Sequence, residues 1–134
     1  MITPRPQHAA YRDARFFLGA GAAVSIDHAL AGAQEGIFAL LPTLSPGENG
    51  AVRFAYDASL AKEAYRLTCD EAGARVAASD RAGALHGAAS LRQLLLHGEA
   101  IPHLALEDAP RFGWRSLSMD VCRHFFPIAT LKKL

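Results

Sequence analysis

The sequence predicts an α+β domain with a mostly antiparallel sheet and two helices on one face, followed by the start of a different unit. Residues 51–57 and 63–70 alternate apolar and polar side chains, as half-buried strands do. Residues 25–41 and 79–98 instead repeat apolar side chains at the spacing of one helix face. After Pro110 the pattern changes again, which indicates that the first domain ends there.

The composition fits one globular domain without a strong charge preference. The chain has 134 residues, of which 51% are hydrophobic and 20% charged, enough for one ordinary core. Its formal net charge is +1 and no basic cluster stands out, which argues against nucleic-acid binding. No apolar run resembles a signal peptide or a membrane span, so the cytoplasm is the default compartment and no membrane contact is expected. A chain trimmed from a longer exported precursor would look the same.

The amino-terminal part is expected to hold one strand and one helix. Residues 14–18 form a short apolar run bounded by glycine, which is typical of a strand. Ser25 or Asp27 is expected to cap the helix of residues 25–41. The segment PTLSPGENG at residues 42–50 is rich in helix and strand breakers and therefore predicts a loop.

The two alternating segments are expected to be strands, and the second of them opens a hairpin. Within residues 63–70, Tyr65, Leu67 and Cys69 fall on one face, which we expect to be buried. Gly73 can adopt the positive φ that a tight turn requires. Residues 75–78 then form the return strand of the hairpin.

A second helix is expected to follow the hairpin. Ser79 or Asp80 would cap its start, and Gly98 would mark its end. Gly83 and Gly87 lie inside it together with several alanines. Because these side chains are small, the helix can lie close to the sheet.

One more strand, at residues 101–107, completes the domain, and a new pattern follows it. Residues 115–121 alternate again, and Pro127 stands where it suits the first turn of a helix. A strand followed by a helix is half of a repeating β/α unit. Because a domain does not normally stop there, we expect the native chain to continue beyond Leu134.

Few residue patterns point to chemistry. The six histidines show no metal-ligand spacing and no complete phosphate loop is present, so neither a metal nor a cofactor is expected. Asp70 and Glu71 form an acidic pair, but the pair lies in the predicted hairpin turn and is best interpreted as solvent-exposed. Cys69 and Cys122 are too few for a disulfide framework and are expected to be buried free thiols.

Asp120, Arg123 and His124 remain as candidate site residues. If residues 115–121 are the first strand of a β/α barrel, these residues lie at its carboxyl end, where such barrels build active sites. The planar guanidinium of Arg123 suits two neighbouring sugar hydroxyls or a carboxylate. Asp120 would then orient this guanidinium or pair with His124. On spacing alone, a surface arginine beside a structural Asp–His contact is the better interpretation.

The segment EDAPRFGWRSLSMDVCRHFFP at residues 107–127 resembles the domain junction of glycoside hydrolase family 20, the β-N-acetylhexosaminidases. Members carry a similar run from an acidic Asp-x-Pro-Arg linker, through Trp-Arg, to Asp-Val-x-Arg-His-Phe. Residues 82–94 also resemble the family, in the pattern A-G-x-x-x-G-x-x-x-L-R-Q-L, and so does the opening ITPRPQ. The resemblance covers most of the chain and is weakest between about Ala22 and Leu60.

The resemblance implies two domains and an activity. Residues 1–108 would form the small non-catalytic amino-terminal domain. Residues 109–134 would form the linker and the first strand and helix of a truncated (β/α)8 catalytic barrel. The full-length enzyme would cleave terminal N-acetylglucosamine or N-acetylgalactosamine residues from glycans with retention of configuration, and the substrate's own acetamido group would be the nucleophile.

The resemblance also assigns roles to individual residues. Arg123 matches the arginine that binds hydroxyls of the terminal sugar, and Asp120 and His124 match structural supports of its loop. The catalytic Asp-Glu pair of the family lies on a later barrel strand, so no catalytic residue is expected here and the chain alone should be inactive. The alternative is a stand-alone interaction or carbohydrate-binding module of the same fold. The oligomeric state stays open.

Overall fold

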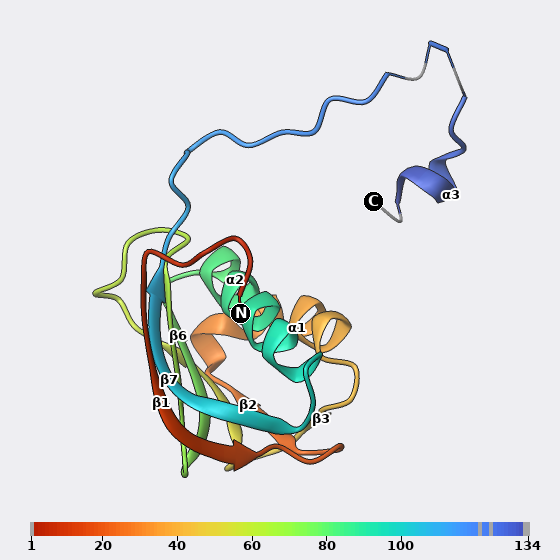
Figure 1. The fold of residues 1–134 in the computed structure, drawn as a ribbon. Helices are drawn as coiled ribbons and strands as arrows, with labels where there is room; N and C mark the ends of the chain where they lie inside the picture. The colour runs from red at the N-terminus through yellow and green to blue at the C-terminus, as the bar shows by residue number, and fades with distance from the viewer. Residues whose placement is uncertain (1, 121, 124, 133–134) are drawn as a thin grey trace.

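The computed structural model describes residues 2–120, 122–123 and 125–132, and it shows a sheet with helices packed on one face (Figure 1). The strands are β1 (His8–Phe17), β2 (Ala23–Ile26), β3 (Ser45–Pro46), β4 (Val52–Tyr56), β5 (Tyr65–Asp70), β6 (Gly73–Ala78) and β7 (Ala100–Asp108). The helices are the 3-10 helix η1 (His28–Ala33), α1 (Gln34–Leu40), α2 (Arg81–Leu95) and α3 (Ile128–Leu131).

Within the described ranges, the sheet has seven strands in the order β1-β7-β5-β6-β4-β2-β3. The pairs β1–β7, β7–β5 and β5–β6 are antiparallel, whereas β6–β4, β4–β2 and β2–β3 are parallel. The sheet is therefore mixed, and the prediction of a mostly antiparallel sheet is not confirmed. The physical reason is the connection through η1 and α1, which carries the chain back to the end of the sheet where β2 begins, so that β4 runs parallel to β2.

The hairpin of β5 and β6 agrees with the prediction. Tyr65, Leu67 and Cys69 are buried on one face of β5, and Gly73 has a φ of +119° in the turn. Burial raises the pKa of the Cys69 thiol to about 12, so this thiol stays protonated and unreactive at neutral pH. The prediction that Cys69 is a buried free thiol is thus confirmed.

Helix α2 covers the centre of the sheet with a face of small residues. Ala84, Ala88 and Leu91 are fully buried against the strands. Gly83 and Gly87 are also buried, and a Cβ at Gly87 would overlap Cγ1 of Val76 in β6. The close approach of helix and sheet that the glycines predict is confirmed. Figure 1 shows α1 and α2 together on this face of the sheet.

The first third of the chain departs from the prediction in its boundaries. Strand β1 begins well before the expected residues 14–18, and the short strands β2 and β3 were not predicted. The first helix begins, as expected, at Asp27, whose carboxylate accepts the N–H of Ala29 at 3.0 Å. It starts as the 3-10 helix η1 before it continues as α1.

The segment after Arg115 extends away from the domain and ends in the short helix α3 (Figure 1). Residues 115–120 form no strand in this structure, so the predicted barrel start is not confirmed. A barrel strand needs neighbouring strands as hydrogen-bond partners, and none lies beside this segment in the described part of the chain. Helix α3 does follow Pro127, where a helix was expected. No helix in the described ranges is long and apolar enough to span a membrane.

Asp80 caps α2, which leads to a pH-dependent prediction. Its side chain accepts the N–H of Gly83 at 2.7 Å and the N–H of Glu63 at 2.9 Å. Although burial by itself raises the pKa of Asp80, these hydrogen bonds and one from Ala82 together hold the pKa below its usual value. We expect Asp80→Ala to lower the free energy of unfolding by about 1–2 kcal/mol at neutral pH.

Because the folded-state pKa of Asp80 is depressed, its stabilising effect is complete above the usual aspartate range and is lost as the pH falls through the lower folded value. Urea unfolding at neutral pH and again below about pH 4 measures how much of this stabilisation is lost. The difference between wild type and Asp80→Ala should shrink in acid. Asp80→Asn keeps a capping oxygen without the charge and serves as control. A difference that is independent of pH would contradict the prediction.

Candidate functional site

Two of the candidate residues after Arg115 form a local ion pair, and neither of them lines the groove beside helix α2. The Nε atom of Arg123 donates to Oδ2 of Asp120 at 2.9 Å, and the N–H of Cys122 donates to the other oxygen, Oδ1, also at 2.9 Å. These two groups, Cys122 first, hold the pKa of Asp120 below its usual value. The side chain of Arg123 is 91% exposed. His124 lies outside the described residues.

The ion pair of Asp120 and Arg123 is therefore present in this structure, but no sugar-binding cavity is described around it. The carboxylate orients the guanidinium, as one of the two sequence interpretations holds, but no wall surrounds it in the described ranges. Cys122 is exposed, so its expected burial is wrong. Asp70 and Glu71 lie in the exposed turn between β5 and β6, where Asp70 accepts the N–H of Ala72. The interpretation of this acidic pair as a solvated turn is confirmed.

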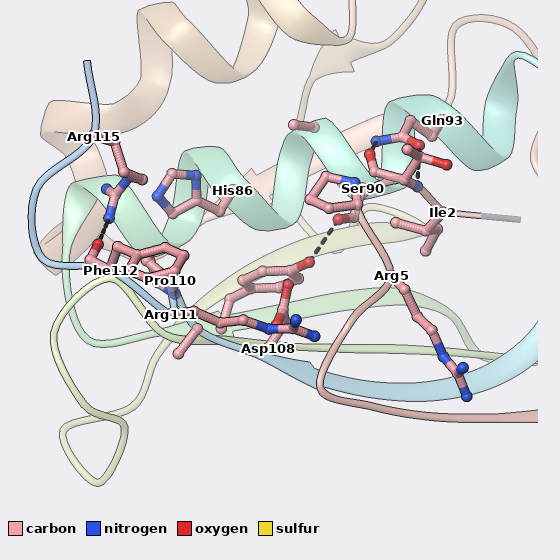
Figure 2. Close-up of a pocket in the computed structure, with 15 residues that line it drawn as sticks. Ile2, Arg5, His86, Ser90, Gln93, Asp108, Pro110, Arg111, Phe112 and Arg115 are labelled. Atoms are coloured by element: carbon pink, nitrogen blue, oxygen red, sulfur yellow. Dashed lines mark hydrogen bonds between the residues drawn. The ribbon is translucent and has the colours of Figure 1, made fainter.

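The groove beside α2 lies elsewhere, at the end of the sheet where the chain leaves β7. It is an open groove of about 510 Å³ between the amino-terminal arm at residues 2–5, helix α2 and the linker at residues 108–115 (Figure 2). Three arginines, Arg5, Arg111 and Arg115, line the groove, and Asp108 is an acidic residue that lines it as well. Its floor is formed by Tyr65 and by one face of α2.

Two hydroxyl groups on the floor of the groove are hydrogen-bonded to each other. The hydroxyl groups of Tyr65 and Ser90 are buried and lie 2.6 Å apart in a hydrogen bond (Figure 2). Burial raises the pKa of Tyr65, which keeps the phenol neutral. Gln93 ties the arm to α2, because its side chain exchanges two hydrogen bonds of 2.8 Å with the backbone of Thr3. These contacts hold the walls of the groove together.

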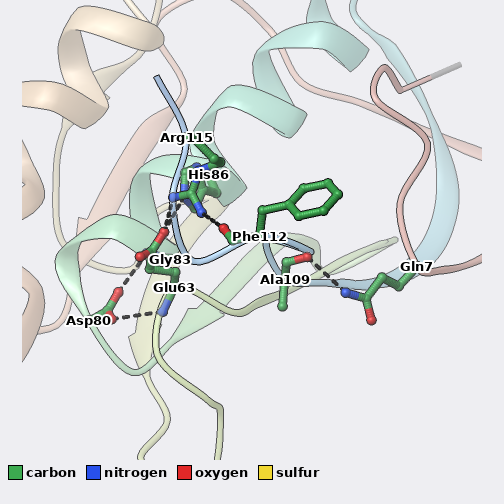
Figure 3. A network of polar contacts seen from close by, with 8 residues as sticks. All are labelled: Gln7, Glu63, Asp80, Gly83, His86, Ala109, Phe112 and Arg115. Atoms are coloured by element: carbon green, nitrogen blue, oxygen red, sulfur yellow. Dashed lines mark hydrogen bonds and ion pairs between the residues drawn. The ribbon is translucent and has the colours of Figure 1, made fainter. Parts of the chain in front are cut away.

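The end of the groove carries a charged cluster centred on Glu63. Its carboxylate pairs with Nη2 of Arg115, and Nε2 of His86 lies 3.6 Å away, beyond hydrogen-bond distance (Figure 3). Arg115, and to a smaller extent His86, hold the pKa of Glu63 below its usual value. No group of three or more metal-ligating side chains occurs in the described ranges.

Sequence reasoning missed this cluster. Glu63 and Arg115 are 52 positions apart, and neither belongs to a recognisable short motif. No sequence signal pointed to it: Glu63 falls in the alternating segment of residues 63–70, whereas β5 begins at Tyr65.

A family model described as glycosyl hydrolase family 20, domain 2, matches residues 1–109. A β-hexosaminidase of Akkermansia muciniphila is 47% identical over 79 residues, covering 56% of this chain and 16% of that protein. A β-hexosaminidase of Vibrio furnissii is 31% identical over 144 residues, covering 99% of this chain and 23% of that protein. The chain thus spans less than a quarter of the length of these curated relatives.

Solved structures show the same fold. A GH20 exo-β-N-acetylglucosaminidase from Vibrio harveyi in complex with N-acetylglucosamine matches with a TM-score of 0.88 and 26% identity. The match covers 98% of this chain and 22% of that protein. An N-acetyl-β-hexosaminidase from Streptomyces plicatus matches with a TM-score of 0.82 and 26% identity, over 98% of this chain and 30% of that protein.

Proposed function

We propose, given that this chain belongs to glycosyl hydrolase family 20, that it is the amino-terminal part of a β-N-acetylhexosaminidase. The observation that carries the proposal is the family match over residues 1–109, joined to relatives that are named β-hexosaminidases and are several times longer. The enzyme would remove terminal N-acetylglucosamine or N-acetylgalactosamine residues from glycans. Most of its active site would come from sequence outside this chain.

The proposed division places a small non-catalytic domain at residues 1–108 and the linker and start of a (β/α)8 barrel at residues 109–134. The apolar side chains of the second part support it. Leu117, Phe125 and Ile128 are each at least 70% exposed, although their spacing is that of residues with a buried face. In the complete protein, neighbouring strands and helices would cover them.

The proposed reaction needs no nucleophile from the protein. The acetamido oxygen of the substrate attacks its own anomeric carbon while the glycosidic C–O bond breaks, and a protein carboxylic acid gives its proton to the departing oxygen. Water then adds to the anomeric carbon of the cyclic intermediate and restores the acetamide. Since both steps invert the anomeric centre, the product retains the β configuration.

Arg123 is proposed to bind hydroxyl groups of the terminal sugar, with Asp120 and His124 as supports. The ion pair of Arg123 and Asp120 supports this role, because it already fixes Nε and leaves the other nitrogens free to donate to a ligand. A planar fork of donors matches two neighbouring hydroxyls.

The activity test compares the complete protein with this 134-residue chain. We expect the complete protein to hydrolyse a chromogenic N-acetyl-β-glucosaminide and the chain alone to show no turnover, because the proton donor lies outside it. NMR of the fresh product should show the β-anomer first. An α-anomer would contradict the mechanism, and turnover by the repurified chain would contradict the division of domains. A complete protein that binds the sugar without cleaving it would favour a carbohydrate-binding module.

A further inference from the structure

The linker that leaves β7 is attached to the domain at its beginning. The backbone N–H of Gln7 donates to Oδ1 of Asp108 at 3.1 Å. Its side-chain Nε2 donates to the carbonyl oxygen of Ala109 at 2.9 Å (Figure 3). Both contacts join segments more than 100 positions apart in the sequence. The first residues of the linker therefore have a fixed path along the amino-terminal arm.

The same linker is attached a second time at Arg115. Its Nη1 donates to the carbonyl oxygen of Phe112 at 2.6 Å, which closes a turn within the linker. Its Nη2 pairs with the carboxylate of Glu63, in the loop before β5 (Figure 3). With both ends held, residues 109–115 form an arch over one end of the groove.

Glu63 is itself held in an unusual backbone conformation. Its φ is +63°, a left-handed value that a residue with a Cβ seldom adopts. Its N–H donates to Oδ2 of Asp80 at 2.9 Å, and Asp80 also caps α2. The backbone of Glu63 is thus fixed to the start of α2, and this fixes the direction of its carboxylate. A strained backbone conformation of this kind persists only where the surrounding structure enforces it.

His86 adds a second basic group beside Glu63. Its Nε2 atom is buried, makes no hydrogen bond, and lies 3.6 Å from Oε2 of Glu63. This imidazole belongs to α2 and lies beside the ion pair of Glu63 and Arg115 (Figure 3). Glu63 is therefore enclosed by Arg115 on the linker, by His86 on α2 and, at its backbone, by Asp80.

The attachment at Arg115 matters because Gly113 lies two residues before it in the linker. Gly113 has no heavy atom within 4 Å of where a Cβ would lie, and glycine can adopt more backbone conformations than any other residue. We propose that Glu63 is a positioning residue that, through Arg115, fixes the direction in which the chain leaves the first domain. Without the ion pair, everything after Phe112 would pivot at Gly113. This inference is independent of the sugar chemistry.

The single tryptophan of the chain, Trp114, is a natural probe between this pivot and Arg115. Its side chain is 84% exposed, so its motion follows the backbone of the linker. The experiment measures the time-resolved fluorescence anisotropy of Trp114 in this chain and in the variants Glu63→Gln and Arg115→Gln. We expect both variants to lose anisotropy through a component faster than the tumbling of the domain.

Four comparisons make the test specific. The double variant should lose no more anisotropy than either single variant, because both remove one interaction. The charge-reversed pair Glu63→Arg with Arg115→Glu should recover most of the loss. Arg111→Gln, which changes an exposed arginine of the same linker, should leave the decay unchanged. The melting temperature should stay nearly constant in every variant, since a partly exposed ion pair adds little stability.

The proposal fails if Glu63→Gln leaves the anisotropy decay of Trp114 at the wild-type value. It also fails if the double variant shows the sum of two separate losses, or if the charge-reversed pair behaves like the double glutamine variant. A variant whose melting temperature falls clearly is compared at a temperature where it is fully folded. These outcomes concern the 134-residue chain alone, so they do not depend on whether the complete protein is a hydrolase.

Discussion

Arg123→Ala in the complete protein is expected to lower kcat/KM for an N-acetylhexosaminide by roughly 10²- to 10³-fold. If Arg123 donates two hydrogen bonds to sugar hydroxyls in an enclosed pocket, each charged bond contributes about 1.5–3 kcal/mol. Their joint loss, about 3–4 kcal/mol, corresponds to that factor. Arg123→Lys should recover little, because a single ammonium cannot reproduce the planar fork. Steady-state kinetics with the chromogenic substrate measure the effect.

Arg12→Ala is the matched control for this substitution. Arg12 is an exposed arginine on β1, on the first domain and far from Arg123 in the sequence, so its removal should leave kcat/KM unchanged. Circular dichroism of both variants shows whether the fold is intact. A folded Arg123→Ala protein with nearly wild-type kcat/KM would remove Arg123 from the proposed site, and the family resemblance would then extend to the fold but not to this residue.

Local patterns predicted most of the first domain, whereas the connections between strands were not predictable from them. The alternation of Tyr65, Leu67 and Cys69 identified β5, because these buried residues alternate with less buried polar ones. Strand β2 has four residues, of which only Val24 is fully buried, so its pattern was too short to detect. The sequence places the strand before the first helix at residues 14–18, which overlap β1, so the parallel pairing of β2 with β4 could not be inferred.

The candidate site shows a similar limit. The Asp120–Arg123 ion pair is a contact three positions apart, and the sequence was enough to suggest it. The cluster of Glu63, His86 and Arg115 depends on the left-handed backbone conformation of Glu63 and on a long-range contact. Neither of these produces a periodic pattern in the sequence. The role of Arg123 came from resemblance alone, since Arg123 does not line the groove found among the described residues.

The close packing of α2 on the sheet gives the second large effect. A Cβ at Gly83 would overlap the backbone carbonyl oxygen of Ala64 and lie 3.3 Å from the Cβ of Ala78. Alanine favours the helix by about 1 kcal/mol over glycine, so propensity alone predicts a more stable protein. The overlap is with backbone, however, and overpacking costs about 1–3 kcal/mol. The N–H of Gly83 also bonds Asp80, so any shift of the helix weakens the cap.

We therefore expect Gly83→Ala to lower the free energy of unfolding by about 2 kcal/mol and Tm by roughly 6–10 °C. Gly36→Ala in α1 is the matched control, since its added Cβ would lie 2.6 Å from Cδ2 of Leu85, the movable end of a side chain. There Leu85 can rotate away and the helix gains from alanine, so stability should stay constant or rise by up to about 1 kcal/mol. Urea and thermal unfolding of the two variants measure these changes in stability. Equal stability of the two would mean that α2 can withdraw from the sheet without cost, and that its small residues do not set the spacing on which the groove depends.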